Sequence, residues 1–229
     1  MSRTFPVLVA LVLSASSAPA ADPFSIKVTD KAEPPKELKD SIRKLLAEKS
    51  VQFLDVKGNQ LAEIWFRKEL PAKATDAQIQ NGLTYQEVSP ATLVGAVRIK
   101  DTLGDYRKQK IKGGVYTMRL AMQPMDGDHM GTAPYGEFLL LVPASADEGK
   151  ETFEPEKLHD LSKKASGTGH PAVFMLFPVA KKDLGKAPAL QMRENKHWVL
   201  NVTQDVTVDG KKKGVLGIGL TLVGFSPAA

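Results

Sequence analysis

Residues 197–225 read HWVLNVTQDVTVDGKKKGVLGIGLTLVGF, and this stretch decides the fold class. Apolar residues recur at the two-residue period of a β-strand from His197 to Val208, and they return from Val215 to Phe225. The dipeptide Asp209-Gly210 between the two runs is typical of a turn. The stretch therefore predicts two successive strands joined by a tight connection.

Similar runs occur throughout the chain. Gly58-Asn59 separates two apolar runs and predicts a β-hairpin around that turn. The segment 70–86 is polar and is predicted to be a connection with one helical turn near its middle. Further strands are predicted at residues 92–100, 114–123, 137–142, 172–179 and 189–194. About nine short strands with one or two peripheral helices predict a mainly β fold, either an antiparallel β-sandwich or a partly open barrel.

Two segments break the β pattern. Residues 36–49 carry leucine and isoleucine at offsets of four, seven and eight from Leu38, which predicts an N-terminal amphipathic helix lying on the sheet. Residues 144–169 are rich in charged and small residues, which predicts an insertion with a surface helix at 154–165.

In the last predicted strand, Gly217 and Gly219 fall on one face, where they allow a bend or the close approach of another backbone.

The first 21 residues have the pattern of a signal peptide. Arg3 precedes an apolar run at 5–13, and Ala18-Pro19-Ala20 offers a cleavage site. The apolar run is shorter than the roughly 20 residues that span a bilayer, so cleavage is favoured over a membrane anchor. We expect residues 1–21 to be removed, residues 22–229 to form a single β domain, and the protein to be secreted or periplasmic with no membrane span.

Composition excludes several classes of function. The chain has no cysteine, which excludes disulfides, thiolate metal sites and a cysteine nucleophile. The net charge is only +5, and the lysines are scattered or in short runs without interleaved aromatic residues, unlike a nucleic-acid-binding face. The Gly-x-Ser-x-Gly motif of serine hydrolases and the phosphate-binding glycine motifs are also absent.

The densest polar cluster is QPMDGDHMG at 123–131. Asp126, Asp128 and His129 could converge on a divalent ion, because the adjacent glycines permit a tight backbone path. The alternative is a long turn between two strands, in which the carboxylates cap backbone amides and the histidine bonds locally. The spacing matches neither an EF-hand loop nor a His-Glu-x-x-His motif, and the turn is the favoured interpretation.

The chain has three further histidines. His170 precedes an apolar strand, and it could join His129 as a fourth metal ligand if that strand lies beside strand 137–142. His159 is placed on the surface helix, and His197 beside Trp198 is read as an edge-of-core pair. Both of these are expected to be structural.

Four segments are distinctive when taken together, namely IKGGVYTMRL at 111–120, the 124–131 cluster, FLLLVP at 138–143 and HWVLNV at 197–202. They resemble a group of exported bacterial β-sandwich proteins known only as domains of unknown function. The likeness covers about half of the chain after the leader. The resemblance implies a β-sandwich and an export route, and it carries over no catalytic residue.

Two hypotheses for function follow. The leading one is an exported, noncatalytic binding or structural module of the bacterial envelope that recognises an envelope protein, a glycan or a small ligand through its loops and requires no cofactor. The alternative is a metal-dependent envelope hydrolase or metal-binding protein, in which a divalent ion held by the 126–129 loop activates a water molecule.

Overall fold

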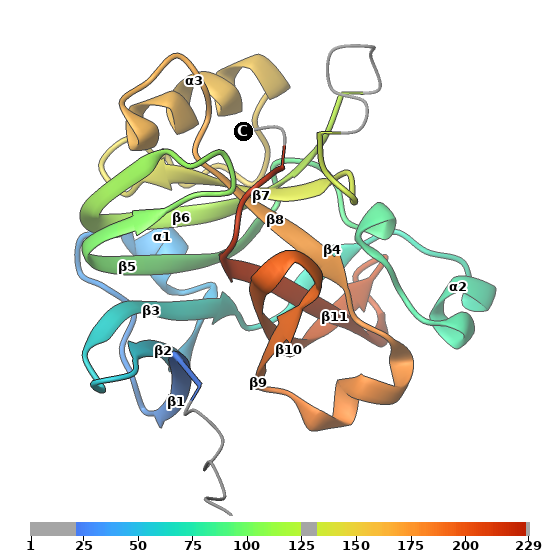
Figure 1. Ribbon diagram of the computed structural model, residues 1–229. Coiled ribbons are helices and arrows are strands. Elements are labelled where there is room, and N and C mark those ends of the chain that lie inside the picture. The colour runs from blue at the N-terminus through green and yellow to red at the C-terminus, as the bar shows by residue number, and fades with distance from the viewer. Residues whose placement is uncertain (1–21, 125–131, 228–229) are drawn as a thin grey trace, which may run out of the picture.

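A computed structural model describes residues 22–124 and 132–227. Within these residues, eleven strands form one sheet that is antiparallel except for one short pair (Figure 1). The strands are β1 (Phe24–Asp30), β2 (Leu46–Asp55), β3 (Gln60–Arg67), β4 (Leu70–Ala72), β5 (Leu93–Gly104), β6 (Lys110–Met122), β7 (Glu137–Pro143), β8 (Val173–Pro178), β9 (Ala189–Arg193), β10 (His197–Val208) and β11 (Lys212–Val223). The helices are α1 (Asp40–Arg43), α2 (Asp76–Asn81) and α3 (Pro155–Ser166), with 3-10 turns η1 (Tyr85–Glu87), η2 (Lys181–Lys186) and η3 (Glu194–Lys196).

The sheet follows the order β1-β2-β3-β5-β6-β7-β8-β11-β10-β4, with β9 also paired to β10. It curls so that its two ends approach each other without closing, and the ring of Phe24 in β1 lies edge-on to Trp198 in β10, with centroids 5.6 Å apart. Alternate side chains from both halves fill one interior core, including Phe53, Leu139 and Leu220. The predicted mainly β class is confirmed, in the form of an open, curled antiparallel sheet.

The turn and strand signals of the sequence are confirmed where they were strongest. β10 and β11 pair along almost their whole length around Asp209 and Gly210, which have positive φ angles of 49° and 70°. This is the backbone that a tight hairpin requires and that Asp-Gly accommodates. At the β2–β3 hairpin, Gly58 has a φ of 79°, and the Asp55 carboxylate accepts hydrogen bonds from the backbone N–H groups of Lys57 and Asn59.

The predicted close approach at Gly217 and Gly219 is present. A Cβ on Gly219 would lie 2.7 Å from the carbonyl oxygen of Phe177, and one on Gly217 would lie 2.5 Å from Cβ of Val179. Beside this contact, the buried Tyr85 hydroxyl donates to the Phe177 carbonyl at 2.8 Å and accepts from the Gly219 N–H at 3.0 Å. The absence of side chains at these two positions therefore lets β8 and the residue that follows it lie tightly against β11.

The predicted helix at 36–49 is wrong in extent. Only α1, one turn long, is helical, and Leu46 to Lys49 belong to β2, which pairs with β1 and β3 on its two sides. The Leu38, Ile42 and Leu46 side chains do pack on the outer face of the sheet, against Trp65. Their spacing permits that contact without a continuous helix, because hydrogen bonding to two neighbouring strands outweighs the helix propensity of this lysine-, glutamate- and leucine-rich segment.

The connections contain more structure than the sequence predicts. The segment before α1 holds edge strand β1, which is not predicted from the sequence, and the polar connection 70–86 holds the three-residue strand β4. The predicted helical turn is α2, capped by Thr75, which accepts a hydrogen bond from the Gln78 N–H. Within the described residues, no helix has both the length and the apolar character needed to cross a membrane.

The predicted surface helix is confirmed as α3. Pro155 occupies its first turn and Gly167 ends it in the left-handed region with a φ of 67°, as expected for helix-start and helix-end signals. Leu158 and Leu161 pack on Leu140 and on neighbouring residues of the outer face of β6 and β7. The helix thus covers one part of this outer face, and the part beside it is left open.

Candidate functional site

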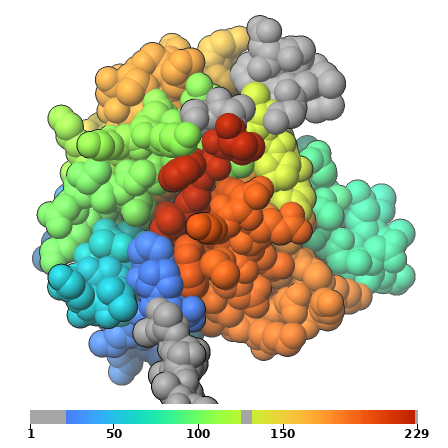
Figure 2. Space-filling view, in the orientation of Figure 1, coloured from blue at the N-terminus to red at the C-terminus, as the bar shows by residue number. Residues whose placement is uncertain are grey.

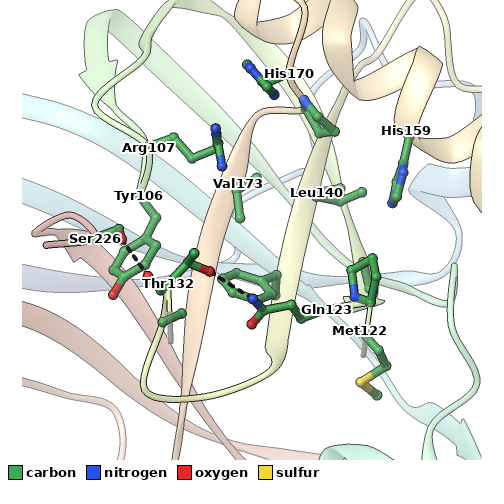
Figure 3. A pocket seen from close by; sticks show the side chains of 15 residues that line it. Tyr106, Arg107, Met122, Gln123, Thr132, Leu140, His159, His170, Val173 and Ser226 are labelled. Carbon is green, nitrogen blue, oxygen red and sulfur yellow. Dashed lines mark hydrogen bonds between the residues drawn. The ribbon is translucent and has the colours of Figure 1, made fainter. Parts of the chain in front are cut away.

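A cavity of about 420 Å³ lies in the open part of the outer face of β6, β7 and β8 (Figure 3). We call it the outer pocket. Its floor is apolar and is formed by outward-facing strand residues, namely Ala121, Phe138, Leu140 and Val173. Its walls come from the β5–β6 turn, α3, the α3–β8 loop, the segments flanking residues 125–131 and the C-terminal segment, through Tyr106, Arg107, Met122, Gln123, Pro124, Thr132, Ala133, His159, His170, Pro171 and Ser226.

A buried carboxylate holds the β5–β6 turn against the start of β8. Asp105, which is 1% exposed, accepts hydrogen bonds at one oxygen from the backbone N–H groups of Arg107 (2.9 Å) and Gln109 (2.8 Å). Its other oxygen accepts from the Val173 N–H at 3.0 Å and the Gln109 amide at 2.7 Å. The Tyr106 N–H donates in turn to the Val173 carbonyl at 2.8 Å. The backbone that carries Tyr106 and Arg107 is therefore fixed relative to the pocket floor.

The α3–β8 loop is attached to the same turn. The Gln109 amide donates to the Pro171 carbonyl at 2.8 Å, and the Thr168 hydroxyl donates to the Gln109 side-chain carbonyl. The Ser166 hydroxyl donates to the His170 carbonyl at 2.6 Å. Two loops that are distant in sequence thus form one hydrogen-bonded rim, which carries Arg107 and His170.

The electrostatic setting of Asp105 follows from its partners. Burial raises the pKa of the Asp105 carboxyl, and the hydrogen bonds from Val173, Gln109 and Arg107 backbone and amide groups lower it only partly. All of these donors are neutral, so no opposite charge offsets the cost of burying the carboxylate. The pKa of Asp105 is therefore above its ordinary value.

The C-terminal segment forms a further wall of the pocket, through Ser226. The Ser226 N–H donates to the Tyr106 carbonyl at 2.8 Å, the Ser226 hydroxyl donates to the Thr132 carbonyl, and the Gln123 amide donates to the Thr132 hydroxyl at 2.8 Å. Figure 2 shows the C-terminal residues, in red, lying between the green strands and the orange ones. The pocket is thus bounded by segments from both halves of the chain.

The adjacent, covered part of the outer face holds a buried ion pair. Arg119 in β6 donates to both oxygens of Asp147, at 2.7 and 2.9 Å, and to the Ala91 carbonyl at 2.8 Å. Asp147 also accepts from the Thr117 hydroxyl at 2.5 Å and the Gly149 N–H at 2.9 Å. Burial alone would raise the pKa of Asp147, but the Arg119 hydrogen bonds and charge, with these two donors, lower it. Each oxygen has partners, so this pair is a structural element.

The predicted metal ligands have different outcomes. Asp126, Asp128 and His129 lie outside the described residues. His170 is described and lies on the rim of the pocket. The strand that follows it does lie beside strand 137–142, as its proposed role requires, because β8 pairs with β7 through Leu140 and Val173. In the described ranges, no three histidine, aspartate or glutamate side chains are close enough to hold a metal ion.

The described neighbours of segment 125–131 are also informative. Pro124 and Thr132 line the same pocket as His170. The two chain positions from which the predicted metal loop departs therefore lie at the pocket that contains the fourth predicted ligand. The metal hypothesis remains a prediction.

The other two histidines differ in environment. His197 is 2% exposed, its Nδ1 lies 2.6 Å from the Glu194 carbonyl, and its ring packs on Tyr106, as the edge-of-core interpretation predicts. His159, which was expected to be purely structural, lines the outer pocket from α3. Sequence reasoning missed this residue, together with Arg107 and Ser226, because they meet only through the pairing order of the strands.

A second cavity, of about 500 Å³, lies between α2 and the outer side of β11. Its lining includes Leu83, Val215 and two lysines. Lys213 forms an ion pair with Glu69, and Lys181 donates to the Gln80 carbonyl at 3.0 Å. Since these lysines already have protein partners, the outer pocket is the stronger candidate site.

Comparisons with family models, with curated proteins and with solved structures found no match to this chain. The resemblance to exported β-sandwich proteins of unknown function therefore remains a prediction from the residues that carry it.

Proposed function

We propose that this protein is a noncatalytic binding module, exported to the bacterial envelope or beyond, and that it holds a small, largely apolar ligand in the outer pocket. The observation that carries the proposal is the apolar floor of a cavity of about 420 Å³, bounded by polar side chains. Ligand sites of small molecules typically measure about 300–1,000 Å³ and combine an apolar lining with a few polar groups.

The environment of the pocket supports binding over catalysis. The Thr132 and Ser226 hydroxyls are engaged with Gln123 and with a backbone carbonyl, as expected of groups that shape the walls. Burial raises the pKa of the Tyr106 hydroxyl, which favours its neutral form. The hydrogen-bonded rim also reduces the ordering that a ligand would otherwise have to impose, and this favours affinity.

A small ligand is the best match among the partners considered. A glycan or an envelope protein would need an extended recognition surface, whereas this site is a concave pocket with an apolar floor.

The proposal that the protein is exported rests on the pattern of residues 1–21, and a direct test is N-terminal sequencing of the protein recovered from a bacterial periplasm. A mature N-terminus after Ala20 or Ala21 is the expected result.

The binding proposal is tested with N-phenyl-1-naphthylamine, a neutral apolar dye whose fluorescence rises in apolar sites. We expect saturable binding at one site in the protein comprising residues 22–229. Val173→Trp adds a large ring to the pocket floor and should abolish the binding, whereas Val56→Trp adds the same ring to a residue that is 64% exposed at the β2–β3 hairpin and should leave it unchanged. Equal binding by both variants would refute the outer pocket as the site.

A divalent-metal site is the second candidate, and one observation favours it. His170 lines the same cavity as Pro124 and Thr132, from which the segment with Asp126, Asp128 and His129 departs. Elemental analysis of protein purified without chelator or polyhistidine tag, beside His129→Ala, tests it. One equivalent of metal that is lost in the variant would support the metal-dependent alternative, whereas protein that stays metal-free when Zn²⁺, Ca²⁺ and Mn²⁺ are offered would reject it.

A further inference from the structure

We infer that the ligand of the outer pocket is a small amphipathic carboxylate, with its apolar body on the strand floor and its carboxylate bound by Arg107 and His170. The inference rests on the proposed function, because it names the chemical class of that ligand.

The first support is the charge of the lining. The ionisable side chains among the described lining residues include one guanidinium, of Arg107, and two imidazoles, of His159 and His170, and they include no carboxylate. In Figure 3, Arg107 and His170 lie at one end of the pocket and Gln123 and Thr132 at the other. The pocket thus offers N–H donors and a positive charge at one end of an apolar floor.

The second support is that Arg107 has no carboxylate partner in the part of the chain that the structure describes. Of the five other arginines among the described residues, four form an ion pair with an aspartate or glutamate, namely Arg43, Arg67, Arg98 and Arg119. The Arg107 backbone is nevertheless fixed by buried Asp105, at 2.9 Å, on the rim of the pocket. A fixed backbone with an exposed, unpaired guanidinium is suited to an external anion.

The third support is the shape of the donors. A guanidinium presents parallel N–H groups that match the two oxygens of a carboxylate. One Arg107 charge balances one carboxylate charge, and His170 adds a nearby ring N–H group. The apolar floor of Phe138, Leu140 and Val173 requires an apolar body next to that head group. A simple small anion would leave this floor uncovered, so the ligand must be amphipathic.

The test uses decanoate and decanol, which share an alkyl chain and differ in the head group. Each is titrated against bound N-phenyl-1-naphthylamine in the presence of EDTA, so that no metal ion can bind the carboxylate. We expect Arg107→Gln to weaken decanoate binding about tenfold, or about 1.4 kcal/mol, because the charge-assisted hydrogen bonds to the carboxylate are lost, and to leave decanol binding unchanged. His170→Gln should weaken decanoate by a smaller factor.

The matched control is Lys211→Gln, which removes one positive charge from an exposed residue at the β10–β11 turn. It should leave the affinity for both compounds unchanged, which separates a local contact from a change in net charge. Circular dichroism melting curves establish that each variant is folded.

The two proposals fail in different ways. If neither decanol nor the dye binds, the proposed function itself is wrong. If decanol and decanoate both bind but Arg107→Gln weakens neither, or weakens both equally, the pocket binds apolar ligands and the carboxylate inference is overturned. Decanoate binding that Arg107→Gln weakens only when EDTA is omitted would also overturn it, because the head group would then depend on a metal ion.

Discussion

Two adjoining parts of the same sheet face differ in how they are covered. Over β6 and β7, α3 buries Leu158 and Leu161 against the strands, and the Arg119–Asp147 pair is fully buried nearby. Beside this region, the same face carries the outer pocket, whose floor includes Leu140 and Val173. The difference shows that α3 covers only one part of this face. The neighbouring part stays open as the outer pocket, and hydrogen-bonded loops form its rim.

The two buried aspartates show the same contrast in electrostatics. Asp147 faces a guanidinium, and its pKa is lowered, whereas Asp105 is held by neutral donors only, and its pKa is raised. A charge-paired carboxylate stabilises the covered region most strongly when it is ionised. The carboxylate at the rim instead orients two loops, and its hydrogen bonds to neutral donors offset the cost of its burial only in part.

The largest expected effect is from breaking the buried ion pair. Asp147→Ala leaves the Arg119 guanidinium, which is 1% exposed, without its carboxylate, and should lower the free energy of unfolding by about 3–5 kcal/mol. Urea denaturation measures this. Asp40→Ala, which removes a carboxylate that is 83% exposed from its pair with Arg43, is the control and should cost less than about 1 kcal/mol. Similar effects of the two changes would contradict the contrast.

The second prediction compares two apolar side chains on this face. Leu158→Ala removes a side chain that is 2% exposed on the buried side of α3. It should lower the free energy of unfolding by about 2–5 kcal/mol, because it creates a cavity. Val173→Ala removes two methyl groups from a partly buried side chain at a pocket that is already open, so its cost should be at most about 1.5 kcal/mol. Thermal unfolding of both variants checks the difference. An equal loss would mean that the pocket floor is packed as tightly as the covered region.

The third prediction concerns Asp105 and has a defined sign with pH. Asp105→Asn replaces one carboxylate oxygen, which accepts hydrogen bonds, with an amide NH₂ group that faces N–H donors. This change should lower the free energy of unfolding by about 1–2 kcal/mol at neutral pH. Because the pKa of Asp105 is raised in the folded state, the folded protein binds more protons than the unfolded chain between the ordinary and the raised pKa. The stability contributed by this group therefore falls as pH rises through that window.

Asp147 should show the opposite sign. Its lowered folded-state pKa gives stability that is present above the ordinary aspartate value of about 3.9 and is lost as pH falls through the folded-state pKa. Denaturation of the wild type, Asp105→Asn and Asp147→Asn at a series of acidic pH values separates the two groups. Parallel pH dependence for the two variants would show that the aspartates do not differ as described.

The smallest expected effect on stability is at the rim. Arg107→Gln changes an exposed side chain that forms no ion pair with the described residues, so the free energy of unfolding should change by less than about 0.5 kcal/mol. Denaturation in urea checks this, with Arg67→Gln as the contrasting variant, because Arg67 is largely buried and pairs with Glu151 at 3.0 Å. A large loss from Arg107→Gln would indicate a structural role for the rim arginine.

Local signals predicted much of this fold. Asp209, Gly210 and Gly58 have positive φ angles, which glycine adopts readily and which favour a turn, and α3 has a proline start, a glycine end and an apolar stripe. The helix predicted at 36–49 fails because its apolar spacing fits both a helix and a turn followed by a strand, and pairing with β1 and β3 decides between them.

The candidate site was much less predictable than the fold. Of the four residues predicted to bind metal, His170 alone is among those that the structure describes, and its place at a pocket depends on the pairing of β7 with β8. Tyr106, His159 and Ser226 come from three separate segments and carry no motif. Their convergence depends on strand order, which the sequence alone left undetermined.

The central claim is that the open part of this sheet face is a ligand site and the covered part is not. The most direct measurement is a methyl NMR spectrum of the protein, with isotope-labelled alanine, leucine, valine and methionine methyl groups, titrated with decanol. The account predicts the largest shifts at Ala121, Leu140 and Val173, and much smaller shifts at Leu158 and Leu161 on the buried side of α3. Shifts concentrated instead around Leu83 and Val215, at the second cavity, or no saturable shifts at all, would contradict it.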